Sequence, residues 1–490
     1  MTKSIIAPTI RDNEHRQNNK EEYRSLALLL VVGAGLALLV ALLIAQDLWF
    51  FAFALVLLVP GALLLNRYTF VGIMLWLLLM PFLPTNNVSP YVLWIVHRSL
   101  MPMALIIALL SRALRLQKHL PVRLGRAELA MVIYLAIAVA SILLTQSSPF
   151  VYLTELYDKT FVPFVAYWLI RFCSPREQDL KRLAVVMLIV CLAQIAIGFW
   201  AKYAPSTLPQ LWAISRMGTR MSGTFGNPNM FAHLLLLLMA FLFHYAMNHK
   251  SKIVQVSFVL VFGIGLLCVF LTFTRACWLA AVLVLLGLGY LYPKTTLPLV
   301  LAAVSIIIVL SASVFAAEAS FAIQRLNTED TIDSRLVLQH AGEQMFLAKP
   351  FLGWGYASYE LYDWTFMERV GNSAPTKWDV QKGSSHNTYL TILAEMGAIG
   401  FFFYFFPAFW WLVRTIKTMP YLPRQGFWSW RLLIVIWLSV IAYLSIGAVI
   451  DMRFSWFSLG AFWLTLGLVA NMIQSYLSPS HSEALERSLA

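Results

Sequence analysis

Arg220 opens the first of three stretches whose residue types could do chemistry. It precedes a Gly-Thr-Phe-Gly segment and then Asn227, Pro228 and Asn229, directly before an apolar run. Asn227 fits the N-cap and Pro228 the first turn of a helix, and the glycines allow a ligand to approach the backbone. Unpaired N–H groups and an arginine fork suit an anion, which predicts that Arg220, Asn227 and Asn229 bind phosphate. The alternative is an ordinary turn, with Arg220 reaching lipid headgroups.

Arg275 belongs to the second stretch. Thr274 and Arg275 form a very short turn between apolar runs that end near Phe273 and begin near Ala276. Such a turn needs no arginine for its structure, so Arg275 is a second candidate for phosphate binding. The alternative is that it pairs with ordinary lipid phosphates.

His386 is the centre of the third stretch, Gly-Ser-Ser-His-Asn-Thr-Tyr-Leu, which also begins an apolar run. Ser384 or Ser385 can cap the helix, which places His386 in its first turn. A histidine there can act as a general base, and the helix dipole favours its neutral form. The alternative is a polar surface residue.

Three further charged residues are auxiliary candidates. Arg216 lies near Arg220 in the sequence, and Arg335 lies in a long polar segment. Glu395 follows His386 by nine residues within the same apolar run, where a carboxylate needs a partner such as Thr391. Because a regular helix turns Glu395 almost opposite His386, we expect it to be architectural. No metal-ligand spacing and no nucleotide-binding glycine motif occurs, so we expect neither a metal nor a cofactor.

The composition requires a membrane for most of the chain. Of 490 residues, 60% are hydrophobic and 12% are charged, with a mean hydropathy of +0.74. The predicted fold class is therefore an all-α polytopic membrane protein with about 12–14 transmembrane helices and one long outer loop containing short helices. Four scattered cysteines suggest neither a disulfide framework nor a zinc site. The net charge of +13 does not indicate nucleic acid once the basic residues are placed on a membrane topology.

The apolar runs define the predicted organisation. They lie at 25–45, 48–65, 68–84, 93–111, 128–145, 151–170, 183–201, 229–247, 253–273, 276–292, 297–317, 387–413, 430–450 and 454–474. Most Lys and Arg residues fall on one side, which predicts that both termini are cytoplasmic. The predicted parts are a cytoplasmic tail (1–24), an N-terminal bundle (25–317), an outer loop (318–386), C-terminal spans (387–475) and a second cytoplasmic tail (476–490).

Two of these predictions concern unusual segments. The run 151–170 is the weakest, because charged residues occupy its first turns, and it could be re-entrant or start later. The outer loop is the one long connection, with helical patterning over 334–347 and a Pro/Gly break after it. Its aromatic residues either form an interfacial belt or stack on sugars. We expect it to act as a lid that delivers His386.

With these stretches in order, the sequence resembles the O-antigen ligase and O-antigen polymerase superfamily of bacterial envelope proteins. The resemblance rests on Arg220 with Gly-Thr-Phe-Gly-Asn-Pro-Asn, Thr274-Arg275, the segment from Ser334 through the glycines near 355, and His386 with Glu395 and Gly397. It covers roughly residues 180–450.

The resemblance implies a glycosyltransferase C-like membrane fold in the bacterial inner (plasma) membrane. It implies a role in lipopolysaccharide or other polysaccharide biosynthesis in the cell envelope. The donor would be an undecaprenyl-diphosphate-linked glycan and the acceptor a glycan or lipid-glycan. Arg220 and Arg275 would hold the diphosphate, and His386 would activate the acceptor hydroxyl without a metal. A multi-pass solute transporter is the alternative. The small number of charged residues within the spans argues against it.

Overall fold

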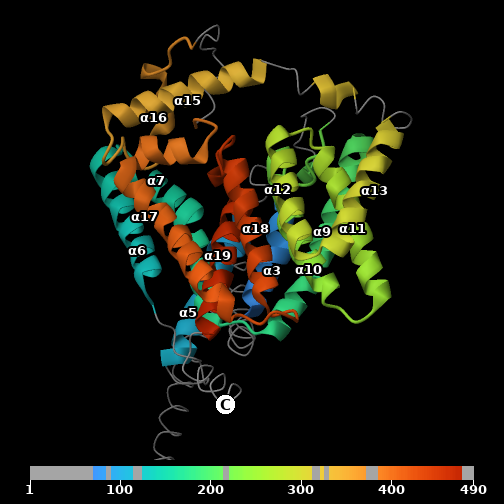
Figure 1. The fold of residues 1–490 in the computed structure, drawn as a ribbon. Coiled ribbons are helices and arrows are strands. Elements are labelled where there is room, and N and C mark those ends of the chain that lie inside the picture. Colours follow the sequence, from blue (N-terminus) through green and yellow to red (C-terminus); the bar gives the residue numbers. More distant parts are fainter. Residues whose placement is uncertain are drawn as a thin grey trace, which may run out of the picture. The chain divides into compact units, whose positions relative to one another are not determined.

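The computed structural model of the chain describes residues 70–83, 90–113, 124–212, 220–311, 320–324, 330–370 and 384–476. All regular elements in these ranges are helices (Figure 1). Seven of the described helices are long and apolar enough to cross a membrane. The all-α polytopic membrane class is therefore confirmed.

The helices have the following bounds. They are α3 (Phe70–Leu79), α4 (Pro90–Leu93), α5 (Leu100–Ala113), α6 (Arg126–Thr145), α7 (Pro149–Leu156), α8 (Val162–Cys173), α9 (Glu177–Tyr203), α10 (Pro228–Met247), α11 (Lys252–Phe270), α12 (Arg275–Leu291), α13 (Pro293–Ser311), α15 (Asp330–Ala348), α16 (Tyr359–Tyr362), α17 (Thr388–Thr418), α18 (Trp430–Gly447) and α19 (Trp456–Tyr476). Short 3-10 turns lie at η1 (Met80–Phe82), η4 (Pro205–Thr207), η5 (Gln210–Trp212), η6 (Asp363–Thr365), η8 (Met419–Tyr421) and η9 (Met452–Phe454), and π turns at η2 (Trp94–Ser99) and η3 (Tyr157–Phe161).

Over its described residues, every predicted span from 68–84 to 454–474 overlaps a helix or a run of helical turns. The predicted spans 25–45 and 48–65 and both tails lie outside the described residues, as does Arg216. The helical patterning over 334–347 corresponds to α15.

Burial divides the helices into central and peripheral ones. About nine tenths of the apolar stretch is buried in α10 and in α19. In α11 only 22% of the apolar stretch is buried. The exposed side of α11 carries Ile253, Val256 and Leu260, each more than half exposed. Such a contiguous apolar surface is stable against lipid tails and costly in water, which agrees with a membrane setting for these helices.

The weakest predicted span, 151–170, lies within a continuous helical segment made of α7, η3 and α8. Its charges are paired. The carboxylate of Asp158 accepts bonds from Nε and Nη2 of Arg98 at 2.7 and 2.6 Å, and Lys159 pairs with Glu155. A fork–fork ion pair offsets much of the cost of burying Asp158.

The segment after α15 docks onto a break in α17. Gly397 has φ 63° and ψ −173°, which interrupts the helix and leaves backbone groups without helical partners. The loop supplies them: the amides of Trp354 and Gly355 donate to the carbonyls of Ala394 and Glu395 (3.0 and 2.8 Å). In return, the amide of Ala398 donates to the carbonyl of Pro350 at 2.8 Å.

The close approach requires glycine on both sides. A Cβ on Gly353 would overlap the carbonyl of Glu395, and a Cβ on Gly397 would overlap the backbone of Phe351. This part of the outer loop is therefore anchored to α17, and α15 and α16 lie across the same end of the bundle as the start of α17 (Figure 1).

Candidate functional site

The loop that begins with Arg220 is held by a buried amide. Gln194 of α9 donates to the hydroxyl of Thr224 at 2.8 Å and to the carbonyl of Pro81 at 3.1 Å. Gly223 and Gly226 have φ of 54° and 65°, a region that favours glycine. A Cβ on Gly223 would also collide with Gln194. The Gly-Thr-Phe-Gly segment is thus a fixed turn that sets the position of Arg220.

Arg220 joins the first and second sequence motifs. Its Nε donates to the carbonyl of Thr272 at 2.9 Å, and its Nη2 donates to the hydroxyl of Thr274 at 2.6 Å. Thr274 is the N-cap residue of α12, and Arg275 is its first helical residue. The turn before α12 and the loop before α10 are therefore one unit, stabilised by Arg220.

The predicted helix start at α10 is confirmed. Asn227 is the N-cap, and its Oδ1 accepts a bond from the amide of Asn229 at 2.9 Å, with Pro228 in the first turn. The thiol of Cys277 lies 3.7 Å from Oδ1 of Asn229. This contact positions Asn229 beside the start of α12.

A cavity of about 260 Å³ lies where these elements meet, and we call it the arginine cavity. Its lining contains three arginines, and no carboxylate is found among the described residues that line it. The residues are Arg220, Asn229, Phe273, Thr274, Arg275, Ala276, Arg335, Leu336, Gln339 and Val449. Four sequence candidates (Arg220, Asn229, Arg275 and Arg335) thus share one cavity, and α15 of the outer loop forms part of its wall.

His386 lies just before α17 and not in its first turn. Asn387 is the N-cap, because its Oδ1 accepts bonds from the amides of Tyr389 and Leu390 at 3.0 and 3.1 Å. The expectation that Ser384 or Ser385 caps the helix is therefore wrong. Asparagine is an equally good N-cap residue, and it is nearer to the run of helical residues.

The backbone at His386 is left-handed, with φ of 52°. Ser385 supports this turn: its hydroxyl lies 2.8 Å from that of Thr391 and donates to the carbonyl of Asn387 at 2.9 Å. A non-glycine residue in this conformation costs of order 1 kcal/mol or more and often occurs where a side chain is aimed at a ligand. His386 is half-buried.

The turn between α18 and α19 is fixed to the start of α17. The hydroxyl of Thr388 donates to the carbonyl of Ile450 at 3.0 Å and accepts from the amide of Met452 at 2.9 Å. Val449 of this turn lines the arginine cavity. The turn therefore connects that cavity to the helix that follows His386.

The partner of Glu395 is Arg453 and not the expected Thr391. Nη1 of Arg453 donates to Oε2 of Glu395 at 2.8 Å, and Nη2 donates to Oδ2 of Asp451 at 2.7 Å. All three residues are largely buried, with the Arg453 side chain 12% exposed. Long-range pairing of this kind has no local signal in the sequence around Glu395.

For Asp451 and Arg453, charge pairing outweighs the effect of burial on the pKa. Burial raises the pKa of Asp451, but the charge and hydrogen bonds of Arg453 lower it more, so the pKa lies below its ordinary value. Burial lowers the pKa of Arg453, whereas Asp451 and Glu395 raise it well above its ordinary value. Asp451 and Arg453 thus keep their charges.

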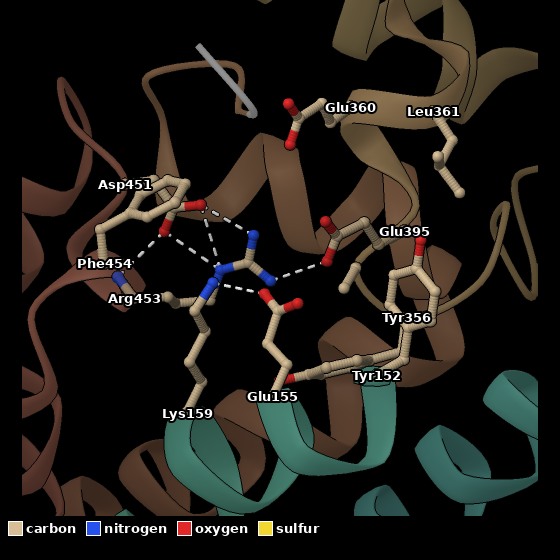
Figure 2. Close-up of a pocket in the computed structure, with 11 residues that line it drawn as sticks. Tyr152, Glu155, Lys159, Tyr356, Glu360, Leu361, Glu395, Asp451, Arg453 and Phe454 are labelled. Atoms are coloured by element: carbon tan, nitrogen blue, oxygen red, sulfur yellow. Dashed lines mark hydrogen bonds and ion pairs between the residues drawn. The ribbon is translucent and has the colours of Figure 1, made fainter. Parts of the chain in front are cut away.

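A second cavity, of about 320 Å³, adjoins this cluster, and we call it the acidic cavity (Figure 2). Four carboxylates and two cations line it, together with aromatic and apolar side chains. The residues are Tyr152, Glu155, Lys159, Tyr356, Ala357, Glu360, Leu361, Glu395, Asp451, Arg453 and Phe454. They come from α7, η3, the outer loop, α17 and the turn before α19.

Sequence reasoning did not identify Arg453, Asp451 or Glu360. A usable signal existed for Arg453, because the 451–453 turn is as short as that of Arg275 and lies on the same predicted outer side, where arginine is disfavoured. The contribution of Glu360 depends on how the outer loop folds, which no local pattern indicates.

Comparison with known proteins gives one family. Residues 258–405 match the family model described as O-antigen ligase, and this range contains Arg275, Arg335, His386 and Glu395. No curated protein matches the chain. The matched range spans α11 to the middle of α17 and thus includes parts of both cavities. This match supports the resemblance of the chain to the O-antigen ligase superfamily over residues 258–405.

Proposed function

We propose that the chain transfers a glycan from an undecaprenyl-diphosphate carrier to an acceptor hydroxyl at the outer face of the bacterial inner membrane. The observation that carries this proposal is the arginine cavity, in which Arg220, Arg275 and Arg335 meet. Three guanidinium groups, with no carboxylate among the described lining residues, suit a diphosphate, which is doubly charged or more. The O-antigen ligase domain supports the reaction class.

The proposed reaction transfers the glycan to the acceptor oxygen and a proton to His386. The acceptor oxygen attacks the anomeric carbon, the bond from that carbon to the diphosphate oxygen breaks, and the electron pair leaves with the carrier. Arg220 and Arg275 stabilise the charge that develops on the leaving group. His386 takes the proton of the acceptor hydroxyl. The activated bond of the carrier supplies the driving force.

The arrangement around Arg220 is already suited to this role. Nε and Nη2 of Arg220 are held by Thr272 and Thr274, which fixes the plane of the guanidinium before any ligand binds. Asn227 and Asn229 lie at the start of α10, whose dipole also favours an anion. Preorganised donors cost little reorganisation when charge develops.

Reconstitution tests the proposal. The purified chain in proteoliposomes, given an undecaprenyl-diphosphate-linked oligosaccharide and a glycolipid acceptor, should transfer glycan, and Arg275→Ala and His386→Ala should lose most of it. Loss of a general base lowers the rate by about 10²–10⁴-fold. Arg369→Ala and His249→Ala are controls: Arg369 is exposed and lines neither cavity, and His249 follows the C-terminal end of α10, opposite the end at which Asn229 lines the arginine cavity.

Two results would contradict the proposal. One is unchanged transfer by both site variants. The other is gradient-coupled solute uptake by the wild-type chain without any transfer, which indicates a transporter. A product ladder formed from lipid-linked glycan alone would identify a polymerase, whereas transfer only to a separate glycolipid would identify a ligase.

A further inference from the structure

The acidic cavity has no role in the reaction as proposed above. Its volume of about 320 Å³ lies within the range of small-molecule sites, and its walls come from four separate segments of the chain. The Arg453 cluster alone does not account for it, because Glu360, Tyr152 and Phe454 line it without belonging to that cluster. Figure 2 shows Glu360 and Glu395 on one side of the guanidinium of Arg453 and Glu155 with Lys159 on another.

The two cavities differ in charge. Three arginines line the arginine cavity, whereas four carboxylates and two cations line the acidic cavity. A second diphosphate would be repelled from the acidic cavity, since carboxylates outnumber cations there. A ligand for it should be neutral or carry a positive charge.

The lining matches the surface of a sugar. Carboxylate and phenol oxygens accept several hydrogen bonds each, so Glu360 and Tyr152 can accept bonds from hydroxyl groups even where neighbouring acids are paired. Phe454 is 47% exposed and Leu361 43% exposed, and they give the cavity an apolar rim. A pyranose has hydroxyl edges and apolar faces, so it can use both kinds of surface.

The position of the cavity fits an acceptor. The turn from Val449 to Arg453 contributes to both cavities, Val449 to the arginine cavity and Arg453 to the acidic one. Thr388, two residues after His386, holds this turn. In a direct displacement the nucleophile attacks the anomeric carbon on the side opposite the departing diphosphate. A glycan in the acidic cavity can therefore present a hydroxyl while the diphosphate occupies the arginine cavity.

We infer that the acidic cavity binds the acceptor glycan, a neutral or amino-sugar-containing oligosaccharide, with Glu360 and Tyr152 contacting its hydroxyl groups. This inference rests on the proposed glycan transfer. It adds a second substrate site with a charge preference opposite to that of the arginine cavity.

Direct binding tests the inference without requiring activity. The probes are the repeat-unit and core oligosaccharides released by mild acid from the glycolipids of the cells that make the protein. Saturation-transfer NMR with the full chain in nanodiscs should detect binding of at least one probe. Glu360→Gln and Tyr152→Phe should each weaken this binding by about tenfold, which corresponds to the loss of one hydrogen bond. Glu343→Gln, an exposed glutamate of α15, is the matched control.

Charge selectivity gives a second readout. Oxidation of primary hydroxyls of the probe to carboxylates should weaken its binding to the wild-type chain. Failure of both probes to bind, or equal binding by the wild-type chain and both variants, would overturn the inference.

Kinetics separate this inference from the proposed function. In proteoliposomes, Glu360→Gln and Tyr152→Phe should raise the KM for the acceptor about tenfold and leave the KM for the donor within twofold. Transfer with an unchanged acceptor KM would overturn the glycan site and leave the transfer standing. Probe binding with the expected losses but no transfer by the wild-type chain would overturn the transfer and leave the glycan site standing.

Discussion

Nη1 of Arg453 lies 2.8 Å from Oε2 of Glu395, so the turn before α19 forms a buried ion pair with a residue inside α17. The same guanidinium binds Asp451. This relationship joins the helix that follows His386 to the last span, and it forms one wall of the acidic cavity.

Arg453→Ala should strongly destabilise the fold. The variant leaves Glu395 and Asp451 buried without their partner, which costs about 3–5 kcal/mol for a broken buried pair. Thermal unfolding of the detergent-solubilised protein measures this loss. Lys181→Ala is the control, because the Lys181–Glu177 pair is 47% and 41% exposed and should contribute less than about 1 kcal/mol. Equal melting temperatures for the two variants would contradict a structural role for the pair.

Gly397→Ala and Gly353→Ala should each loosen the docking of the outer loop on α17. An added Cβ meets backbone atoms that cannot move aside, and both positions have positive φ. The expected effects are a lower melting temperature and faster proteolysis within 349–356.

Gly263→Ala and Gly289→Ala are matched controls for these glycine variants. Nothing lies within 4 Å of a Cβ built at either position in α11 or α12. Alanine also has the higher helix propensity, so stability should stay equal or rise slightly. Similar losses in all four variants would mean that the docking geometry is not the cause.

Arg335→Ala should weaken binding of undecaprenyl diphosphate by about tenfold or more, because an arginine–phosphate contact is charge-assisted. Arg335 is the contribution of α15 to the arginine cavity. Fluorescence titration of the purified chain with undecaprenyl diphosphate measures this without any transfer reaction. Arg369→Ala should bind as the wild type does. Wild-type affinity in Arg335→Ala would remove α15 from the diphosphate site.

Asp363 should make the stability of the outer loop depend on pH. Its side chain is fully buried, and burial raises its pKa from 3.8 to about 7, against the opposing effect of the Trp364 amide and with a further increase from Glu360. Because the folded pKa lies above the unfolded one, the stabilising contribution is complete below about pH 4 and is lost as the pH rises to about 7.

Asp363→Asn tests this dependence. Asparagine cannot ionise, so the variant should gain in melting temperature relative to the wild type between pH 4 and pH 7, with a constant difference above that range. Melting curves at pH 4, 5.5, 7 and 8.5 measure it. A difference that does not change with pH would contradict a raised pKa at Asp363.

Most of the helices follow from the sequence, because each span must be apolar over the width of a bilayer and its backbone groups must bond within the helix. The same local physics predicted the Asn227 cap of α10 and the short turn at Arg275. Where local rules allowed a choice, as between Ser384, Ser385 and Asn387 as the cap, the prediction was wrong. Several similar residues compete there, and the backbone at His386 decides between them.

The sequence by itself determined the membrane class and the positions of the described spans, and it supplied the candidate arginines and His386. Only the tertiary structure decided that Arg220, Arg275 and Arg335 share a cavity and that Arg453 pairs with Glu395. It also decided that Gly353 docks against the break at Gly397. The physical reason is the distance along the sequence between the residues that interact. Caps, turns and spans depend on neighbours within a few residues, whereas cavities and buried ion pairs depend on which helices pack together, and hydropathy is nearly the same for every possible pair of spans.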